Sequence, residues 1–127
     1  MDLTPLIPSG RQIVESYGEG RFRVTGRLFT GSVLVFPERT LDWPVAGSGD
    51  ANLENLEAVL AAGRAGTVEL LLFGQGPRMA PVPPSLRQGL REAGVGLELM
   101  DTGAACRTYN VLMAESRRVA AALIAVL

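Results

Sequence analysis

Residues 101–115 read DTGAACRTYNVLMAE, and this stretch decides the fold. It follows a short apolar run, residues 95–100, that has the composition of a strand. It opens with Asp101 and Thr102, which are residue types that cap helices, and continues in helix-forming sequence. It also contains Cys106, the only cysteine of the chain. We therefore predict a strand followed by a helix at this point.

Similar units precede this stretch. Residues 68–73 predict a buried strand, and residues 85–93 predict a short helix. Further upstream, apolar residues recur at helical spacing and predict another helix, which Gly63 would end: Leu53, Leu56, Val59 and Leu60. Alternating strands and helices need crossover connections, which favour parallel pairing and a sheet covered by helices.

The first 37 residues follow a different pattern. The segments 12–17 and 21–25 flank Gly18-Glu19-Gly20, which predicts a hairpin. Residues 32–36 form a continuous apolar run that ends at Pro37, as expected for a strand buried on both faces. The N-terminal part is therefore predicted to be antiparallel and β-rich, and to share one core with the α/β part.

Length and composition limit the possible classes of protein. A chain of 127 residues with a formal net charge of −1 is predicted to form one domain over residues 1–127, with residues 1–10 as an extended arm. This charge gives no field that would attract nucleic acid. All basic residues are Arg, and the absence of Lys and His excludes Lys Schiff-base chemistry and His acid–base catalysis.

Cysteine content and hydropathy bear on the compartment. A single Cys cannot form an internal disulfide, which indicates a reducing environment. Residues 1–10 lack the features of a signal peptide, and the apolar stretch 119–127 is too short to span a bilayer. We expect a cytoplasmic protein without membrane insertion. No metal site and no cofactor are expected, because the chain has no His, one Cys and no dense carboxylate pattern.

Four blocks in a fixed order resemble a known family of small domains: GSVLVFP (31–37), ELLLFGQG (69–76), PPSLRQGLREAGV (83–95) and MDTGAACRTYNVLMAESRRVAAAL (100–123). This is the family that includes the mitochondrial complex I assembly factor 3 and the adipogenesis-associated domain protein of animals. The resemblance implies a three-layer α/β sandwich with a central mixed sheet and a closing C-terminal strand antiparallel to its neighbours. Residues 117–127 alone are compatible with helix or strand. The resemblance implies a break near Ser116 and a strand over 118–125.

A candidate site follows from the predicted sheet. In a parallel arrangement the ends of strands and the starts of the following helices meet at one edge, where ligands favour binding. The segments 74–76 and 101–110 would meet there. The N–H groups of the helix start, with a cation in the first turns, would suit a small anion such as phosphate or carboxylate. The candidate ligand-binding residues are Gly74, Gln75, Gly76, Asp101, Thr102, Gly103, Arg107 and Asn110.

The same residues also allow structural roles. Asp101 could cap the helix and pair with Arg107, which would close the anion site internally. Cys106 is either a buried thiol or a reactive one, because a helix start and a neighbouring Arg both lower a thiol pKa. Tyr109 is predicted to be a core residue with its hydroxyl bonded, and Asn110 is predicted to bond either a neighbouring backbone or a ligand.

Trp43, the only tryptophan, is predicted to cover the edge of the core, with a stacking platform for a ligand as the alternative.

Three functions follow from these observations. The leading one is a non-enzymatic interaction or assembly factor with an unidentified protein partner, and the family resemblance implies a relation to the biogenesis of a membrane or respiratory complex. The alternative is a binder of, or an enzyme acting on, a small anionic ligand in a crevice between residues 74–76 and 101–110. The third is a structural subunit of a homo-oligomer. No complete catalytic constellation is present, which favours a protein that is not an enzyme.

Overall fold

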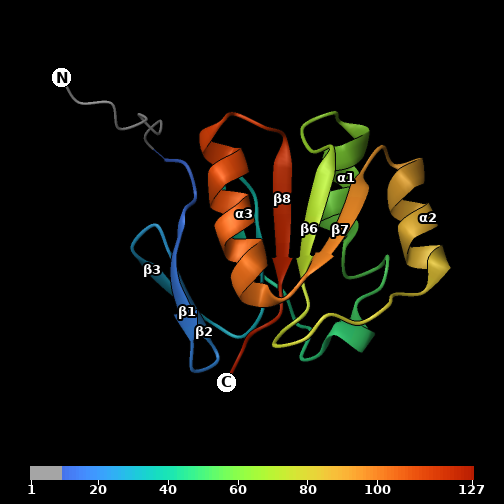
Figure 1. Cartoon of the computed structure of the whole chain (residues 1–127). Coiled ribbons are helices and arrows are strands. Elements are labelled where there is room, and N and C mark those ends of the chain that lie inside the picture. Colours follow the sequence, from blue (N-terminus) through green and yellow to red (C-terminus); the bar gives the residue numbers. More distant parts are fainter. Residues whose placement is uncertain (1–9) are drawn as a thin grey trace.

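A computed structural model describes residues 10–127, so residues 1–9, most of the predicted arm, lie outside the described part. Along the described chain the elements are β1 (Val14–Gly18), β2 (Arg21–Val24), β3 (Arg27–Thr30), β4 (Val33–Val35), β5 (Thr40–Asp42), the 3-10 helix η1 (Ser48–Asp50), α1 (Glu57–Arg64), β6 (Leu70–Gly74), α2 (Pro84–Glu92), β7 (Gly96–Met100), α3 (Thr102–Ala114) and β8 (Val119–Leu123). Figure 1 shows their arrangement.

The central sheet is mixed and has the strand order β5-β4-β8-β6-β7. The C-terminal strand β8 lies in its middle, antiparallel to β4 and parallel to β6. The predicted mixed sheet is therefore confirmed, with the difference that β8 is antiparallel to only one neighbour. Parallel pairing with β6 follows from the connection through α3, which returns the chain to the starting edge of the sheet.

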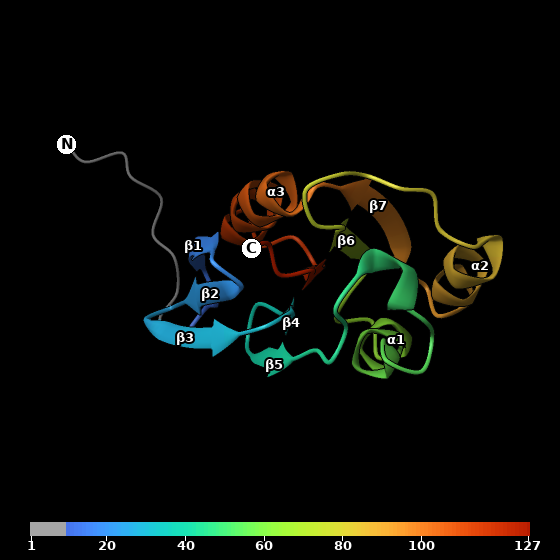
Figure 2. The same ribbon diagram turned by 90° about the horizontal axis from the view of Figure 1, so that it is seen from below.

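Two hydrophobic clusters cover the two faces of the central sheet. Leu71 and Phe73 of β6 pack in the cluster that contains α1 and α2, whereas Leu72 packs in the cluster that contains α3 and the N-terminal strands. This alternation is the period of two expected for a strand buried on both faces. Figure 2 shows the layers from below, with α1 and α2 apart from α3 and β1–β3. The predicted three-layer α/β sandwich is confirmed.

The N-terminal strands form a separate antiparallel sheet in the order β1-β2-β3. The two-residue turns 19–20 and 25–26 join them, and all four turn residues have positive φ, as in type I′ hairpins. This confirms the predicted hairpin and the β-rich N-terminal part. One face of the small sheet buries Phe22, Val24 and Phe29 against α3 and the central sheet.

The ends of two helices depend on local contacts. Ser116 has a φ of 62° and ends α3, which confirms the predicted break before the last strand. Gly63, in contrast, was predicted to end α1 and lies inside it. A Cβ on Gly63 would lie 2.6 Å from the carbonyl oxygen of Ala93, so glycine here allows the helix to approach a neighbouring loop.

Trp43 covers the edge of the core, as predicted. Its side chain is buried, its indole N–H donates to the carbonyl oxygen of Asn55 at 2.9 Å, and its ring meets the edge of Phe73 at 5.9 Å between centroids. The ring is therefore engaged inside the protein and is not an exposed stacking platform. Within residues 10–127, no helix is long and apolar enough to cross a membrane.

Candidate functional site

The two segments of the predicted crevice meet through direct hydrogen bonds. The Thr102 N–H donates to the carbonyl oxygen of Gly76 at 2.9 Å. The Thr102 hydroxyl accepts from the Gly76 N–H at 2.9 Å and donates to the carbonyl oxygen of Ile124 at 2.8 Å. Thr102 is fully buried. This residue therefore ties the end of β6 to the end of β8.

Close packing fills the space between these segments. A Cβ on Gly74 would lie 3.0 Å from Ala105 Cβ, from Leu123 Cδ2 and from Thr102 Cα, so the backbone of β6 lies directly against α3. The buried Gln75 folds back on its own loop, where its amide accepts from the Ala80 N–H and donates to the Ala80 carbonyl oxygen. The two predicted segments therefore contact each other through Gly74, Gly76 and Thr102, while Gln75 and Gly76 also line a groove and Arg107 and Asn110 line a smaller hollow beside β1.

Asp101 caps α3, as one of the two predictions for this residue stated. Its carboxylate accepts from the Ala104 N–H at 2.8 Å. This carboxylate is thus the anion nearest the helix start, where the helix dipole favours negative charge. The predicted ion pair with Arg107 is not formed within residues 10–127; Arg107 is exposed, and its guanidinium lies beside Gly103 and Tyr17.

The polar residues further along α3 bind β1. The Asn110 side chain accepts from the Val14 N–H at 3.0 Å and donates to the Val14 carbonyl oxygen at 2.8 Å, in the way that a neighbouring strand would. The Tyr109 hydroxyl donates to the carbonyl oxygen of Gln12 at 2.9 Å, as expected of a core tyrosine. Burial raises the Tyr109 pKa above its ordinary value. We call this contact, formed by Gln12, Val14, Tyr109 and Asn110, the joint.

Gly103 lets the small sheet pack on the start of α3. A Cβ at this position would clash with the Tyr17 hydroxyl, and it would lie 3.3 Å from an Arg107 guanidinium nitrogen. Tyr17 therefore lies over the glycine, next to Arg107. The missing side chain at Gly103 serves close contact between two elements. A ligand-binding role of these residues stays a prediction.

Cys106 lies buried under the joint. Its side chain is 4% exposed, and burial raises the pKa of its thiol to about 12 although the charge of Arg107 lowers it. Arg107 lowers this pKa, as expected, but desolvation of the thiolate has the larger effect, so the net shift is upward. The geometry favours the buried structural thiol over the reactive one.

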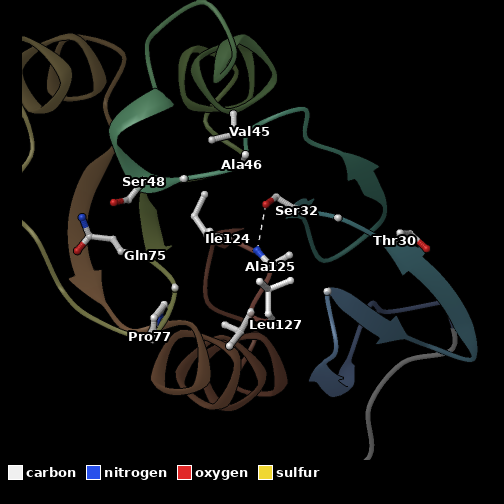
Figure 3. A pocket seen from close by; sticks show the side chains of 15 residues that line it. Thr30, Ser32, Val45, Ala46, Ser48, Gln75, Pro77, Ile124, Ala125 and Leu127 are labelled. Carbon is white, nitrogen blue, oxygen red and sulfur yellow. Dashed lines mark hydrogen bonds between the residues drawn. The ribbon is translucent and has the colours of Figure 1, made fainter.

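A groove opens at the carboxyl edge of the central sheet, the edge where the sequence predicts a ligand site, and two of the predicted residues, Gln75 and Gly76, line it. It has a volume of about 760 Å³ and lies between the chain after β8, the loop after β6, the loop before η1 and the end of β3. Figure 3 shows Ile124 and Val45 on its wall, and the hydrogen bond from the Ala125 N–H to the Ser32 hydroxyl oxygen, 3.0 Å long. Glycine, small aliphatic side chains and backbone atoms form most of its walls. These groups give no signal in the sequence.

The side chains that line this groove are mainly apolar. None of the side chains that line it is ionisable. Its apolar wall residues are Val45, Ala46, Pro77, Ile124, Ala125, Val126 and Leu127, and its polar side chains are those of Thr30, Ser32, Ser48 and Gln75. An open apolar groove with few polar groups is typical of a site that accepts an apolar side chain or ligand.

Similar proteins fall into two groups. An uncharacterised protein of Rhodobacter capsulatus is 39% identical over 116 residues, which are 91% of this chain and 86% of that protein. NADH dehydrogenase (ubiquinone) 1 alpha subcomplex assembly factor 3 of Xenopus tropicalis is 36% identical over 111 residues, which are 87% of this chain and 60% of that protein. The chain also covers 59% of the human assembly factor, at 29% identity. It thus spans only part of the assembly-factor relatives.

Solved structures have the same fold. A crystal structure from Bartonella henselae, described as an outer membrane protein, superposes with a TM-score of 0.85 at 36% identity and covers 93% of this chain and 98% of that one. A solution structure from Bordetella pertussis, described as an Mth938-like domain, superposes with a TM-score of 0.82 at 33% identity and covers 98% and 92%. The family model for a protein of unknown function (DUF498/DUF598) matches residues 14–124, and the chain belongs to this family.

Proposed function

We propose that this protein is a non-enzymatic assembly factor that binds a partner protein during the biogenesis of a respiratory complex. The observation that carries the proposal is the similarity to complex I assembly factor 3, which is 36% identical over 111 residues in the frog protein. The matched part is 60% of that relative, so the client and the role are carried over as part of the proposal. The protein partner expected from the sequence agrees with this proposal.

The chemistry of the described residues supports binding over catalysis. The chain has no His, and its only thiol is buried with a raised pKa. The groove at the carboxyl edge has no ionisable side chain on its walls. These features leave a rigid surface with an apolar groove, which suits recognition of another protein.

The experiment is deletion of the gene in the source organism, followed by measurement of assembled complex I on native gels and of NADH dehydrogenase activity in membranes. Loss of the assembled complex while its subunits are still synthesised supports the proposal. Return of the complex when the chain is expressed again is the control. A normal level of assembled complex in the deletion strain contradicts the proposal.

The alternative, a small anion bound near residues 74–76 and 101–110, has less support. Asp101 and Thr102 already engage the helix start and the Gly76 backbone. Titration with phosphate or sulfate, observed by amide NMR, tests it. Shifts at Gly103 and Arg107 in the millimolar range would favour an anion site, and unchanged amides there would exclude it.

A further inference from the structure

The strand β3 has a free edge. It pairs with β2 on one side and with no strand of residues 10–127 on the other. Thr25 and Gly26, with φ of 45° and 79°, form the two-residue turn between β2 and β3. In such a hairpin the flanking pair, Val24 and Arg27, shares its hydrogen bonds. Leu28 and Thr30 therefore direct their N–H and C=O groups away from β2, toward solvent.

This free edge leads into the groove. Thr30, the last residue of β3, and Gly31 both line it. Figure 3 shows Thr30 at the end of the strand, on the side of the groove away from Gln75. A chain that paired with Leu28 and Thr30 would continue past Gly31 along the groove. Leu28, 49% exposed, offers an apolar neighbour on the outer face of such a chain.

Positive charges outnumber negative ones beside this edge: Arg21, Arg23 and Arg27 lie near two carboxylates, those of Glu15, which accepts from the Gly26 N–H, and Glu19. Arg21 and Arg23 lie on the outer face of β2, and Arg27 lies at the edge with its guanidinium 4.8 Å from the centre of the Phe29 ring. Glu19 pairs with Arg21 at 3.4 Å. In the described part of the chain, Arg23 and Arg27 have no carboxylate partner within ion-pair distance.

This charge selects among possible occupants of the edge. A second copy paired through its own β3 would bring the arginines of both copies onto one continuous sheet, where like charges repel. A strand with carboxylates would place them beside Arg27 on one face and toward Arg23 on the other. Charge complementarity thus favours an acidic partner over a second copy.

We propose that β3 and the groove together form the binding site for an extended, acidic segment of a partner protein. The segment adds a strand to β3 through the backbone of Leu28 and Thr30 and places one apolar side chain in the groove. Backbone pairing supplies affinity in this mode, and the pocket and charges supply specificity. The inference rests on the proposed function and specifies how that partner is recognised.

The test uses a synthetic ten-residue peptide that alternates Val with Glu and ends in Phe. A second peptide replaces Glu by Lys, and a third carries N-methyl groups at alternate residues, which removes the donors of one edge. We expect amide shifts at Leu28, Thr30 and Ala46 with the Glu peptide. We expect an affinity at least about tenfold lower for each of the other two peptides. The Lys peptide lacks the carboxylates, and the N-methylated peptide lacks the backbone donors of one edge.

Two protein variants test the same site. Leu28→Pro removes an N–H that points to solvent at a sheet edge, where Pro is tolerated. Ala46→Trp fills the groove. Each is expected to weaken binding of the Glu peptide about tenfold or more, while the matched controls Leu28→Thr and Ala46→Ser stay within about threefold. The amide spectrum checks that each variant is folded, and the N-methylated peptide tests the edge on the unchanged protein.

Other outcomes overturn the inference. Equal binding of the Lys peptide, or shifts confined to α2, would exclude this site for an acidic strand. A dimer in sedimentation that Leu28→Pro abolishes would assign the edge to a second copy. Capture of one defined partner by the wild type and equally by Leu28→Pro and Ala46→Trp would exclude this site and leave the proposed function standing, whereas capture of none by the wild type would count against the function itself.

Discussion

The joint between α3 and β1 and the groove at the carboxyl edge differ in almost every physical respect. At the joint, the side chains of the buried Tyr109 and the part-buried Asn110 bond the backbone of β1 and of Gln12 just before it. In the groove, small apolar residues and backbone face open space. The joint has the residues that usually signal chemistry, yet all of them have internal partners. The groove has few such residues, yet it has room for another molecule.

The comparison shows that polar residue types mark places where hydrogen bonds are needed, whether or not a ligand supplies them. A buried backbone N–H or C=O must find a partner. Asn110 is that partner for Val14 on the side of β1 that faces α3, where no strand pairs with it. The predictions below test the two regions against each other. Changes at the joint are expected to alter stability and reactivity, and changes in the groove are expected to alter binding alone.

The largest expected effect is on the reactivity of Cys106. Its pKa is raised from 9.0 to about 12, and the thiolate is the reactive form, so near pH 8 its reaction with a thiol reagent should be about 1000-fold slower than that of an exposed cysteine. The rate should rise with pH well beyond pH 9. Reaction with a disulfide reagent in native buffer and in urea measures the ratio. Equal rates in both would show that the joint does not bury the thiol.

Replacement of Asn110 by Leu should destabilise the protein by about 3 kcal/mol, because the N–H and C=O of Val14 both lose their partner in a part-buried site. Urea denaturation gives the free energy of unfolding. Arg107→Gln on the exposed face of the same helix is the control and should change it by less than about 0.5 kcal/mol. Similar changes in the free energy of unfolding for both variants would show that the Asn110 hydrogen bonds stabilise the protein no more than an exposed side chain does.

The sequence predicts the elements better than it predicts their contacts. Periodicity locates the strand at 68–73 and the helix at 101–115, because each pattern is local. The partner of Asn110 lies 96 residues away, so its identity depends on where β1 docks, which no local pattern contains. The shape of the groove could not be predicted, because five segments distant in the sequence form it, mainly from glycine and small or apolar residues. The sequence shows the polar residues of α3, but it does not show the groove.

Replacement of Thr102 by Val should cost about 2 kcal/mol. Val keeps the shape but cannot accept from the Gly76 N–H or donate to the Ile124 carbonyl oxygen, both in a buried place. Because Gly76 and Ile124 also line the groove, this variant changes a buried contact of α3 and the wall of the groove together. Thermal denaturation measures the loss, with Thr108→Val on the same helix as the control. A loss no larger than that of the control would contradict the role given to the Thr102 hydroxyl.

The smallest expected effect on stability lies in the groove. Ala46 is exposed and lines it, so Ala46→Trp should change the free energy of unfolding by no more than about 0.5 kcal/mol, the range usual for surface positions. Its expected effect is on partner binding. Ala46→Trp should therefore weaken partner binding and leave the free energy of unfolding nearly unchanged. Asn110→Leu should lower the free energy of unfolding. If Ala46→Trp unfolds the protein as Asn110→Leu does, the groove belongs to the packed interior, and the contrast between an internal joint and an external binding surface is lost.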